Sequence, residues 1–310
     1  MRIAHLSDLH VLALEGVPAA RFANKRLTGY ANLRFKRNHA HRSSYVRSIL
    51  REIRSAKLDH VVITGDLTNL ALESEFAAVR EMLENDLNLS PSQVSIIPGN
   101  HDVYTRGAML SRRFSSFFSD YIASDLPQLQ ANLEVGHFPY VHLRGEAAII
   151  GLSSAVPRLP LVAAGVLGRK QLHALECILA HPEVQRRLPV LLMHHPIHNF
   201  VSSTKTMLEG LHDANALREV LATTRSGLLL HGHLHKRMQQ PLSTREGSMQ
   251  SVGATSASLA HKDGAKMAGF NVYDIDSDHN VKVFARVLHP ATETFSTEIV
   301  PSVLEAPIAH

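Results

Sequence analysis

Five short clusters of carboxylate, imidazole and amide side chains are the residues of this chain whose types and spacing could do chemistry. They are Asp8-Leu9-His10, Gly65-Asp66, Gly99-Asn100-His101-Asp102, His194-His195-Pro196 and Gly232-His233-Leu234-His235. Carboxylates and imidazoles are ligands that Zn, Fe, Mn, Co and Ni ions accept in proteins. Together the clusters hold more of these ligands than one ion can take, so the sequence predicts a site for two metal ions.

Each cluster stands at the end of a short aliphatic or β-branched run that predicts a buried strand. The predicted strands are Ile3–Ser7, Val61–Thr64, Val94–Ile97, Ala147–Leu152, Val190–Met193 and Gly227–Leu230. Ligands of open α/β sheets bind outside the carboxyl ends of the strands, so clusters at equivalent strand ends are expected to converge on one pocket. Gly65, Gly99 and Gly232 would let the backbone turn sharply and aim the next side chain into that pocket.

Amphipathic stretches alternate with these strands, which is typical of a layered α/β fold. Three apolar faces at helical spacing predict core-facing helices: Tyr45, Val46, Ile49, Leu50 and Ile53; Phe76, Val79 and Leu83; Leu172, Leu175 and Ile178. After Pro241 the pattern changes to strand-like pieces at 249–252, 270–275 and 281–287. We expect residues 1–310 to form a single domain, in which residues 241–310 complete a second sheet and a C-terminal tail.

The composition, 45% apolar and 19% charged residues, is that of a folded globular protein. The longest apolar runs are strand-sized and far short of the roughly 20 residues that cross a bilayer, so we expect no transmembrane segment. The N-terminus reads as a strand and not as a secretion signal. The single cysteine, Cys177, excludes an intramolecular disulfide and a thiolate-rich metal site, and its position on a helix-like apolar face predicts packing. We therefore expect a cytoplasmic location.

Positive charge is concentrated in one stretch of the chain. The whole sequence has 32 Lys and Arg against 28 Asp and Glu, a net charge of +4. From Arg21 to Arg54 ten cations stand against Glu52 alone, a local charge of +9, which leaves −5 for the rest. This basic segment favours an anionic partner, such as a nucleotide, a nucleic acid or an anionic lipid surface. A solvated surface is the alternative interpretation.

The five clusters, in this order, resemble the motifs of the calcineurin-like metallophosphoesterases. The resemblance covers roughly residues 2–275 and is closest to bacterial class III cyclic-nucleotide phosphodiesterases and glycerophosphodiesterases. It implies a four-layer α/β/β/α fold, a two-sheet β-sandwich flanked by helices. It also implies two divalent or mixed-valence metal ions: one held by Asp8, His10, Asp66 and His235, the other by Asp66, Asn100, His194 and His233, with Asp66 as the bridge.

The same resemblance implies roles for side chains around the metals. His101 would donate a proton or a hydrogen bond to the departing oxygen, and Asp102 would orient it. Asn100 and His101 would contact substrate, and His198 is a further candidate. His195 is expected to support the metal ligands or to belong to the core, without binding metal itself. Histidines outside the motifs are expected to be structural or on the surface; they are His5, His60, His173, His181, His212, His261 and His289.

These residues predict a binuclear metal-dependent phosphoesterase that hydrolyses a P–O bond by in-line attack of a metal-bridging hydroxide. Two divalent ions, Asp8, Asp66 and a hydroxide sum to a charge of about +1, which a monoanionic phosphodiester would neutralise. A lipid-linked nucleotide diphosphatase or a nuclease of the same superfamily is an alternative, and the basic segment would then serve an extended anionic substrate. A metal-free scaffold protein is the alternative from another class, although a scaffold would be expected to have lost ligands.

Overall fold

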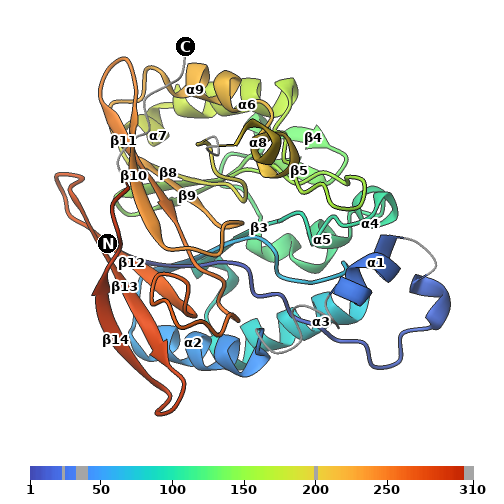
Figure 1. The fold of residues 1–310 in the computed structure, drawn as a ribbon. Helices are drawn as coiled ribbons and strands as arrows, with labels where there is room; N and C mark the ends of the chain where they lie inside the picture. The colour runs from blue at the N-terminus through green and yellow to red at the C-terminus, as the bar shows by residue number, and fades with distance from the viewer. Residues whose placement is uncertain (23–24, 33–40, 199–201, 304–310) are drawn as a thin grey trace.

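The computed structural model describes residues 1–22, 25–32, 41–198 and 202–303. Two six-stranded sheets form its centre. Helices α2 (Ser43–Ser55) and α3 (Glu73–Met82) lie on the side of one sheet, and α6 (Arg169–Leu179) and α9 (Ala214–Leu221) on the side of the other (Figure 1). The fold is therefore the mixed α/β arrangement of two sheets flanked by helices that the sequence predicted.

The first sheet has the order β14-β13-β12-β1-β2-β3. Its strands β1, β2 and β3 run parallel, so their carboxyl ends lie at one edge of the sheet. Strands β12, β13 and β14 extend it in antiparallel fashion from the other side of β1. The bounds are β1 (Arg2–Leu6), β2 (His60–Thr64), β3 (Val94–Ile97), β12 (Gly269–Ile275), β13 (Val281–His289) and β14 (Thr294–Ile299).

The second sheet has the order β10-β11-β9-β8-β7-β6. Here β7, β8, β9 and β11 run parallel, while the edge strands β6 and β10 are antiparallel to their neighbours. The bounds are β6 (Tyr140–Arg144), β7 (Ala147–Gly151), β8 (Leu188–Leu192), β9 (Leu228–His231), β10 (Met238–Ser243) and β11 (Ser248–Gly253). The predicted strands thus exist, with ends that differ by one or two residues.

Alternation along the central strands creates two cores. On β7, Ile149 belongs to the core between the sheets, whereas Ile150 packs toward α6 and α9 with Leu175 and Leu217. A strand whose neighbouring side chains point to opposite faces must be apolar throughout when both faces are covered. This explains the continuous apolar runs in the sequence. The three predicted helix faces are all buried.

Shorter elements complete the described chain. They are α1 (Lys25–Asn32), α4 (Arg106–Leu110), α5 (Arg113–Phe117), α7 (Pro182–Gln185), α8 (Ser203–Glu209) and a hairpin of β4 (Ala131–Leu133) and β5 (Gly136–Phe138). In the part of the chain that the structure describes, no helix has both the length and the apolar character needed to cross a membrane.

The segment after Pro241 supplies strands to both sheets. β11 joins the second sheet, whereas β12, β13 and β14 join the first through β1. Pro241 itself lies inside β10, an edge strand, where the missing N–H costs no ladder hydrogen bond. Local hydrophobic patterns predict strands, but they do not predict which distant strands pair.

The expected packing role of Cys177 is wrong, because this side chain is exposed. Leu172, Leu175 and Ile178 form the buried face of α6, and Cys177 lies with Glu176 on the solvent side. One step along a helix turns a side chain by about 100°, which moves it from the buried face to the exposed one.

Part of the basic segment holds the fold together. Arg47 and Arg51 of α2 both pair with Asp86, a residue that is only 4% exposed.

We predict that Asp86→Ala lowers the free energy of unfolding by about 1–3 kcal/mol, since it leaves the guanidinium groups of Arg47 and Arg51 without their common partner. Denaturant unfolding measures this. Glu219→Ala, which removes an ion pair with Arg245 that is 71% exposed on both sides, is the control and should cost less than about 0.5 kcal/mol. Equal effects of the two substitutions would contradict the prediction.

Candidate metal centre

The five polar clusters meet where the two sheets present the carboxyl ends of their parallel strands. Asp8 and His10 follow β1, Asp66 follows β2 and Asn100 follows β3. His194 follows β8, and His233 and His235 follow β9. Strand order therefore brings together residues that are more than 200 positions apart in the chain.

One group of ligand atoms surrounds Asp8. Its Oδ1 lies 3.0 Å from Nε2 of His235 and 3.8 Å from Nε2 of His10. The two imidazole Nε2 atoms lie 3.1 Å apart. Nε2 of His10 is also 4.0 Å from Oδ2 of Asp66. Asp8, His10 and His235 thus form a three-residue group that could hold a metal ion.

A second group surrounds Asp66 and His194. Oδ2 of Asp66 lies 3.3 Å from Nε2 of His194, which is 3.1 Å from Oδ1 of Asn100. The ring of His233 is 5.1 Å from that of His194, centroid to centroid. The Nδ1–H of His194 donates to the carbonyl of Thr64 at 2.8 Å, which points its Nε2 at Asp66. Asp66 also belongs to a group with His10 and His101, so its carboxylate lies between both halves of the site.

Five of the predicted ligands adopt a left-handed backbone, which is unfavourable for residues other than glycine. Their φ angles are +53° at Asp8, +47° at His10, +51° at Asp66, +67° at His233 and +50° at His235. Hydrogen bonds hold these conformations: the N–H of Asp8 donates to Gly65, that of His10 to Asp66, and the Ser256 hydroxyl donates to the carbonyl of Asp8. Such strain at one place indicates a site whose side-chain directions matter more than local stability.

The glycines of the clusters serve two different purposes. Gly65 has a φ of +89°, so it provides the predicted turn. At Gly99 a Cβ atom would lie 2.2 Å from Oδ1 of Asp66, and at Gly232 one would lie 2.5 Å from Oδ2 of Asp8. These two positions therefore require glycine because the ligand carboxylates approach the backbone closely.

Burial and neighbouring charges set the protonation of the ligands. Burial opposes ionisation of Asp66, but His194, His101 and His10 around it hold its pKa well below the usual value. Burial also opposes a charge on His194, yet Asp66 and Asp8 raise its pKa to about 9. Burial lowers the pKa of His233 to about 3 and that of His10 well below its usual value. Without metal, the site therefore presents ionised carboxylates and neutral rings at His10 and His233, the forms that bind metals, whereas His194 carries a proton that metal binding would displace.

The residues present fit a divalent cation. Oδ1 of Asp8 is buried and accepts no hydrogen bond from the described residues. Two imidazole nitrogens face each other beside this oxygen, and neutral rings can share only one proton between them. Lone pairs of nitrogen and oxygen that converge in this way are satisfied by a cation, and this donor set suits Zn, Fe, Mn, Co or Ni.

His101 and Asp102 lie beside Asp66. The backbone N–H of His101 donates to Oδ1 of Asp66, and the Nδ1–H of its ring donates to the carbonyl of Asn69 at 2.7 Å. The ring also stacks on Tyr104, with centroids 5.6 Å apart. Nε2 is therefore the atom of His101 with which a proton can be exchanged.

Asp102 differs from its expected role. Its buried carboxylate accepts backbone N–H groups of Gly99, Leu67 and Thr68 and the Thr68 hydroxyl. These bonds fix the loop that carries His101, while the Asn69 carbonyl orients the ring. Burial, followed by the charge of Asp66, raises the pKa of Asp102 to about 7.

The remaining candidate histidines fall into separate environments. His195 is fully buried, its Nε2–H donates to Ala163, and its ring lies 4.6 Å from that of His233. His198 lies near Arg218 of α9 and belongs to none of the three ligand groups. His5 and His60 are buried and hydrogen-bonded to Thr64 and Ser95, as structural residues should be.

Sequence reasoning missed His41, whose ring lies 4.9 Å from that of His10 and 5.8 Å from that of His235. Its Nδ1 is 2.7 Å from the hydroxyl of Ser258. A signal existed, because His39-Ala40-His41 repeats the spacing of His233-Leu234-His235. His41 lies within the basic segment and follows none of the predicted strands, so the strand-end pattern did not identify it.

The basic segment is largely engaged within the protein where the structure describes it. Arg21 pairs with Glu73, and the buried Arg26 donates to the carbonyls of Leu70 and Ala71. Lys25 lies over the ring of Tyr104 and donates to the carbonyl of Arg158. Arg34, Lys36 and Arg37 lie outside the described residues.

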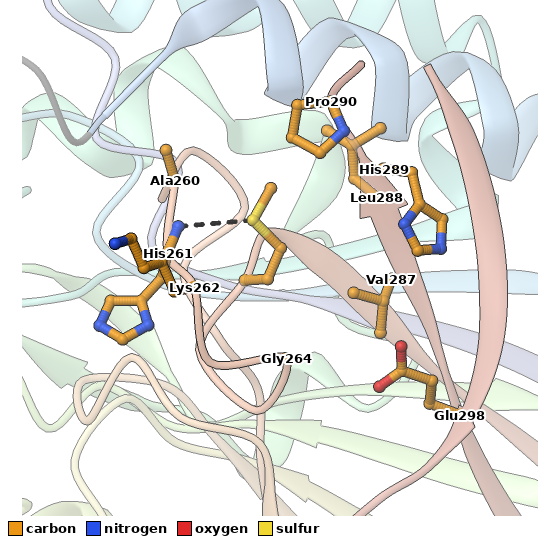
Figure 2. A pocket seen from close by; sticks show the side chains of 10 residues that line it. Ala260, His261, Lys262, Gly264, Val287, Leu288, His289, Pro290 and Glu298 are labelled. Atoms are coloured by element: carbon orange, nitrogen blue, oxygen red, sulfur yellow. Dashed lines mark hydrogen bonds between the residues drawn. The ribbon is translucent and has the colours of Figure 1, made fainter. Parts of the chain in front are cut away.

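A cavity of about 640 Å³ lies away from this site (Figure 2). It lies between the 260–267 loop and β13, and Met267, Leu288 and Pro290 are among the residues that line it (Figure 2). A second cavity of about 260 Å³ is lined by residues that follow β7 and by residues of α4, with the predicted ligands absent from both linings.

Two sheets flanked by helices, with carboxylates and imidazoles converging at their strand ends, are the architecture of metallophosphoesterases. The profile of the calcineurin-like phosphoesterase family matches residues 1–237, and the chain belongs to this family. No curated protein matches the chain.

Solved structures show the same fold at low identity. A dimetal phosphatase from Danio rerio is 13% identical, with a TM-score of 0.59, and the match covers 97% of this chain and 99% of that one. A purple acid phosphatase from seeds of yellow lupin (Lupinus luteus) is 13% identical with a TM-score of 0.57, and the match covers 98% of this chain and 54% of that one. At this identity the likeness concerns the fold alone.

We predict that Asp66→Asn abolishes binding of both metal ions, because Asp66 contributes to both groups of ligand atoms and the amide has no charge. The protein is loaded with Mn²⁺ or Zn²⁺, desalted and analysed by inductively coupled plasma mass spectrometry. Asp278→Asn, in an exposed turn, is the control and should keep the wild-type metal content. Wild-type metal content in Asp66→Asn would show that Asp66 is not a shared ligand.

Proposed function

We propose that this protein is a binuclear metal-dependent phosphodiesterase that hydrolyses a P–O bond. One cation would be held by Asp8, His10, Asp66 and His235, and the other by Asp66, Asn100, His194 and His233. The observation that carries the proposal is the buried Asp66 carboxylate, which lies 3.3 Å from Nε2 of His194 and 4.0 Å from Nε2 of His10. Family membership and the fold shared with a dimetal phosphatase support it.

When bound, two divalent cations activate a water molecule for attack on phosphorus and neutralise charge on the phosphoryl oxygens. The protein would preorganise the site. The left-handed backbone of the ligands and the close approach of Gly99 and Gly232 to the carboxylates fix the orientation of the ligand side chains before substrate binds, so the reaction needs little reorganisation.

His101 would protonate the departing oxygen. Its Nδ1–H is committed to the Asn69 carbonyl, which leaves Nε2 to carry the proton that the leaving group receives. The Tyr104 ring and the loop fixed by Asp102 would keep this nitrogen in place.

Charge supports a diester over a monoester. With neutral imidazole ligands, two divalent cations, the carboxylates of Asp8 and Asp66 and one hydroxide would sum to a charge of about +1, so the site would attract an anion. A diester carries one negative charge and needs less compensation than a dianionic monoester. Within the family we favour class III cyclic-nucleotide phosphodiesterases or glycerophosphodiesterases, with a lipid-linked nucleotide diphosphatase or a nuclease as the alternative.

A substrate panel tests the proposed reaction. Cyclic nucleotides, glycerophosphodiesters, nucleotide-lipid pyrophosphates, short nucleic acids and phosphate monoesters are each offered with Mn²⁺, Zn²⁺, Co²⁺, Ni²⁺ and Fe²⁺. We expect higher kcat/KM for diesters than for monoesters of the same alcohol. Hydrolysis of monoesters alone would contradict the diesterase proposal, and a protein without bound metal or activity would favour the scaffold alternative.

We predict that His101→Ala keeps both metal ions and slows hydrolysis of esters with poor leaving groups by roughly 10²- to 10⁴-fold. An alkyl leaving group needs a proton as it departs, whereas nitrophenolate leaves without one, so nitrophenyl esters should lose much less. The measurement compares kcat for alkyl and nitrophenyl diesters in both proteins.

His173→Ala, on the exposed side of α6, is the matched control and should leave both rates unchanged. An equal loss on the two classes of ester would mean that His101 positions the phosphate and does not protonate the leaving group.

A further inference from the structure

We propose that the cavity of about 260 Å³ is a subsite for an apolar group of the phosphoester, an aromatic ring or a short alkyl chain. This inference rests on the proposed function. Its volume is below the roughly 300–1,000 Å³ of pockets for drug-sized ligands, which suits one part of a substrate.

One wall of the cavity adjoins the metal ligands. Ser153 and Ala155 line the cavity, and Ser154 between them lies with its hydroxyl 2.8 Å from Nδ1 of His195. The ring of His195 in turn lies 4.6 Å from that of His233. Two side chains, Ser154 and His195, therefore connect this wall to a predicted ligand.

Another part of the lining belongs to the segment that follows His101. Met109 of α4 lines the cavity, and Tyr104, which stacks on His101, precedes this helix. Strand β3, which leads into the His101 loop, packs against β7, which ends two residues before Ser153. The cavity is thus bracketed by the two loops that also border the metal centre.

The lining favours an uncharged, apolar occupant. Met109, Val135, Ala155 and Leu167 are each buried to 92% or more, with exposed fractions of 8%, 5%, 3% and 5%. Glu134 and Lys170 line the cavity as exposed residues of opposite charge, so they recruit no second anion. An apolar surface with little net charge gains most from an aryl or alkyl group.

The wall is also rigid and offers one polar group. Gln171 accepts the N–H of Ser153 and donates to its carbonyl, which fixes the backbone there. The Ser153 hydroxyl is buried and has no hydrogen-bond partner among the described residues. A nucleobase, which offers hydrogen-bonding atoms to this hydroxyl and an apolar ring face to the rest of the lining, suits the cavity better than a glycerol group, whose hydroxyls would lose water here.

A series of alkyl p-nitrophenyl phosphates tests the subsite, because the leaving group and its chemistry stay constant. With the methyl, ethyl, propyl, butyl and benzyl esters, kcat/KM should rise about threefold to fourfold per added methylene until the cavity is full. Ala155→Phe fills the cavity and should remove this rise, so that all the esters have about the same kcat/KM in the variant. Ala180→Phe, at the exposed end of α6, is the control and should keep the rise.

Val166→Ala is a second test of the subsite, for the case that Ala155→Phe does not fold. Val166 lines the cavity and is half-buried, so its truncation enlarges the space and should move the best substrate to a longer chain. Thermal unfolding establishes that each variant is folded before kinetics are compared. Unchanged chain-length profiles in both variants would overturn the subsite.

A binding measurement separates this inference from the proposed function. 2-Naphthol, titrated into metal-free protein and followed by its fluorescence, should bind saturably to wild type and Ala180→Phe but not to Ala155→Phe. Binding of this kind without hydrolysis of any ester would uphold the cavity and refute the function. Hydrolysis at the same kcat/KM for all esters, with no naphthol binding, would refute the subsite and leave the function intact.

Discussion

The burial of two carboxylates side by side is the constraint on which this structure depends. Asp8 is fully buried and Asp66 is 2% exposed, and both remain ionised beside the imidazole rings of His10, His101, His194 and His235. Buried like charges are expensive unless cations or hydrogen-bond donors compensate them. Without metal, a protonated His194 supplies one such charge. With metal bound, the two ions would supply the compensating charge, because His194 must lose its Nε2 proton to act as a ligand. The need to compensate these buried charges therefore explains the cluster of histidines independently of catalysis.

The fold follows from the need to bring these groups to one point. Parallel strands that end at one edge place Asp8, Asp66 and Asn100 together from the first sheet and His194 and His233 from the second. The left-handed backbone at five of these ligands is unfavourable locally, and a large buried core offsets it. The stability of the buried core thus permits an unfavourable backbone conformation at the ligands, whose side chains must point into the site.

Much of this arrangement could be predicted from the sequence, because strands that end in glycine, aspartate or histidine are local patterns. The inner strands, the three buried helix faces and the convergence of the clusters are such features. What escaped prediction depends on distant contacts: the pairing of β12 with β1, the approach of His41 to His10, and the hydrogen bonds of Asp102 to residues 67 and 68. Cys177 was expected on the apolar face of α6, but it directly precedes Ile178 of that face, and one residue is enough to turn its side chain to solvent.

The central claim, that Asp66 joins two metal ions, is tested most directly by anomalous X-ray diffraction from crystals of the Mn²⁺-loaded protein. The account predicts two anomalous peaks that share the Asp66 carboxylate, one touching His10 and His235 and the other touching Asn100 and His194. A single peak, or two peaks of which only one touches Asp66, would contradict it.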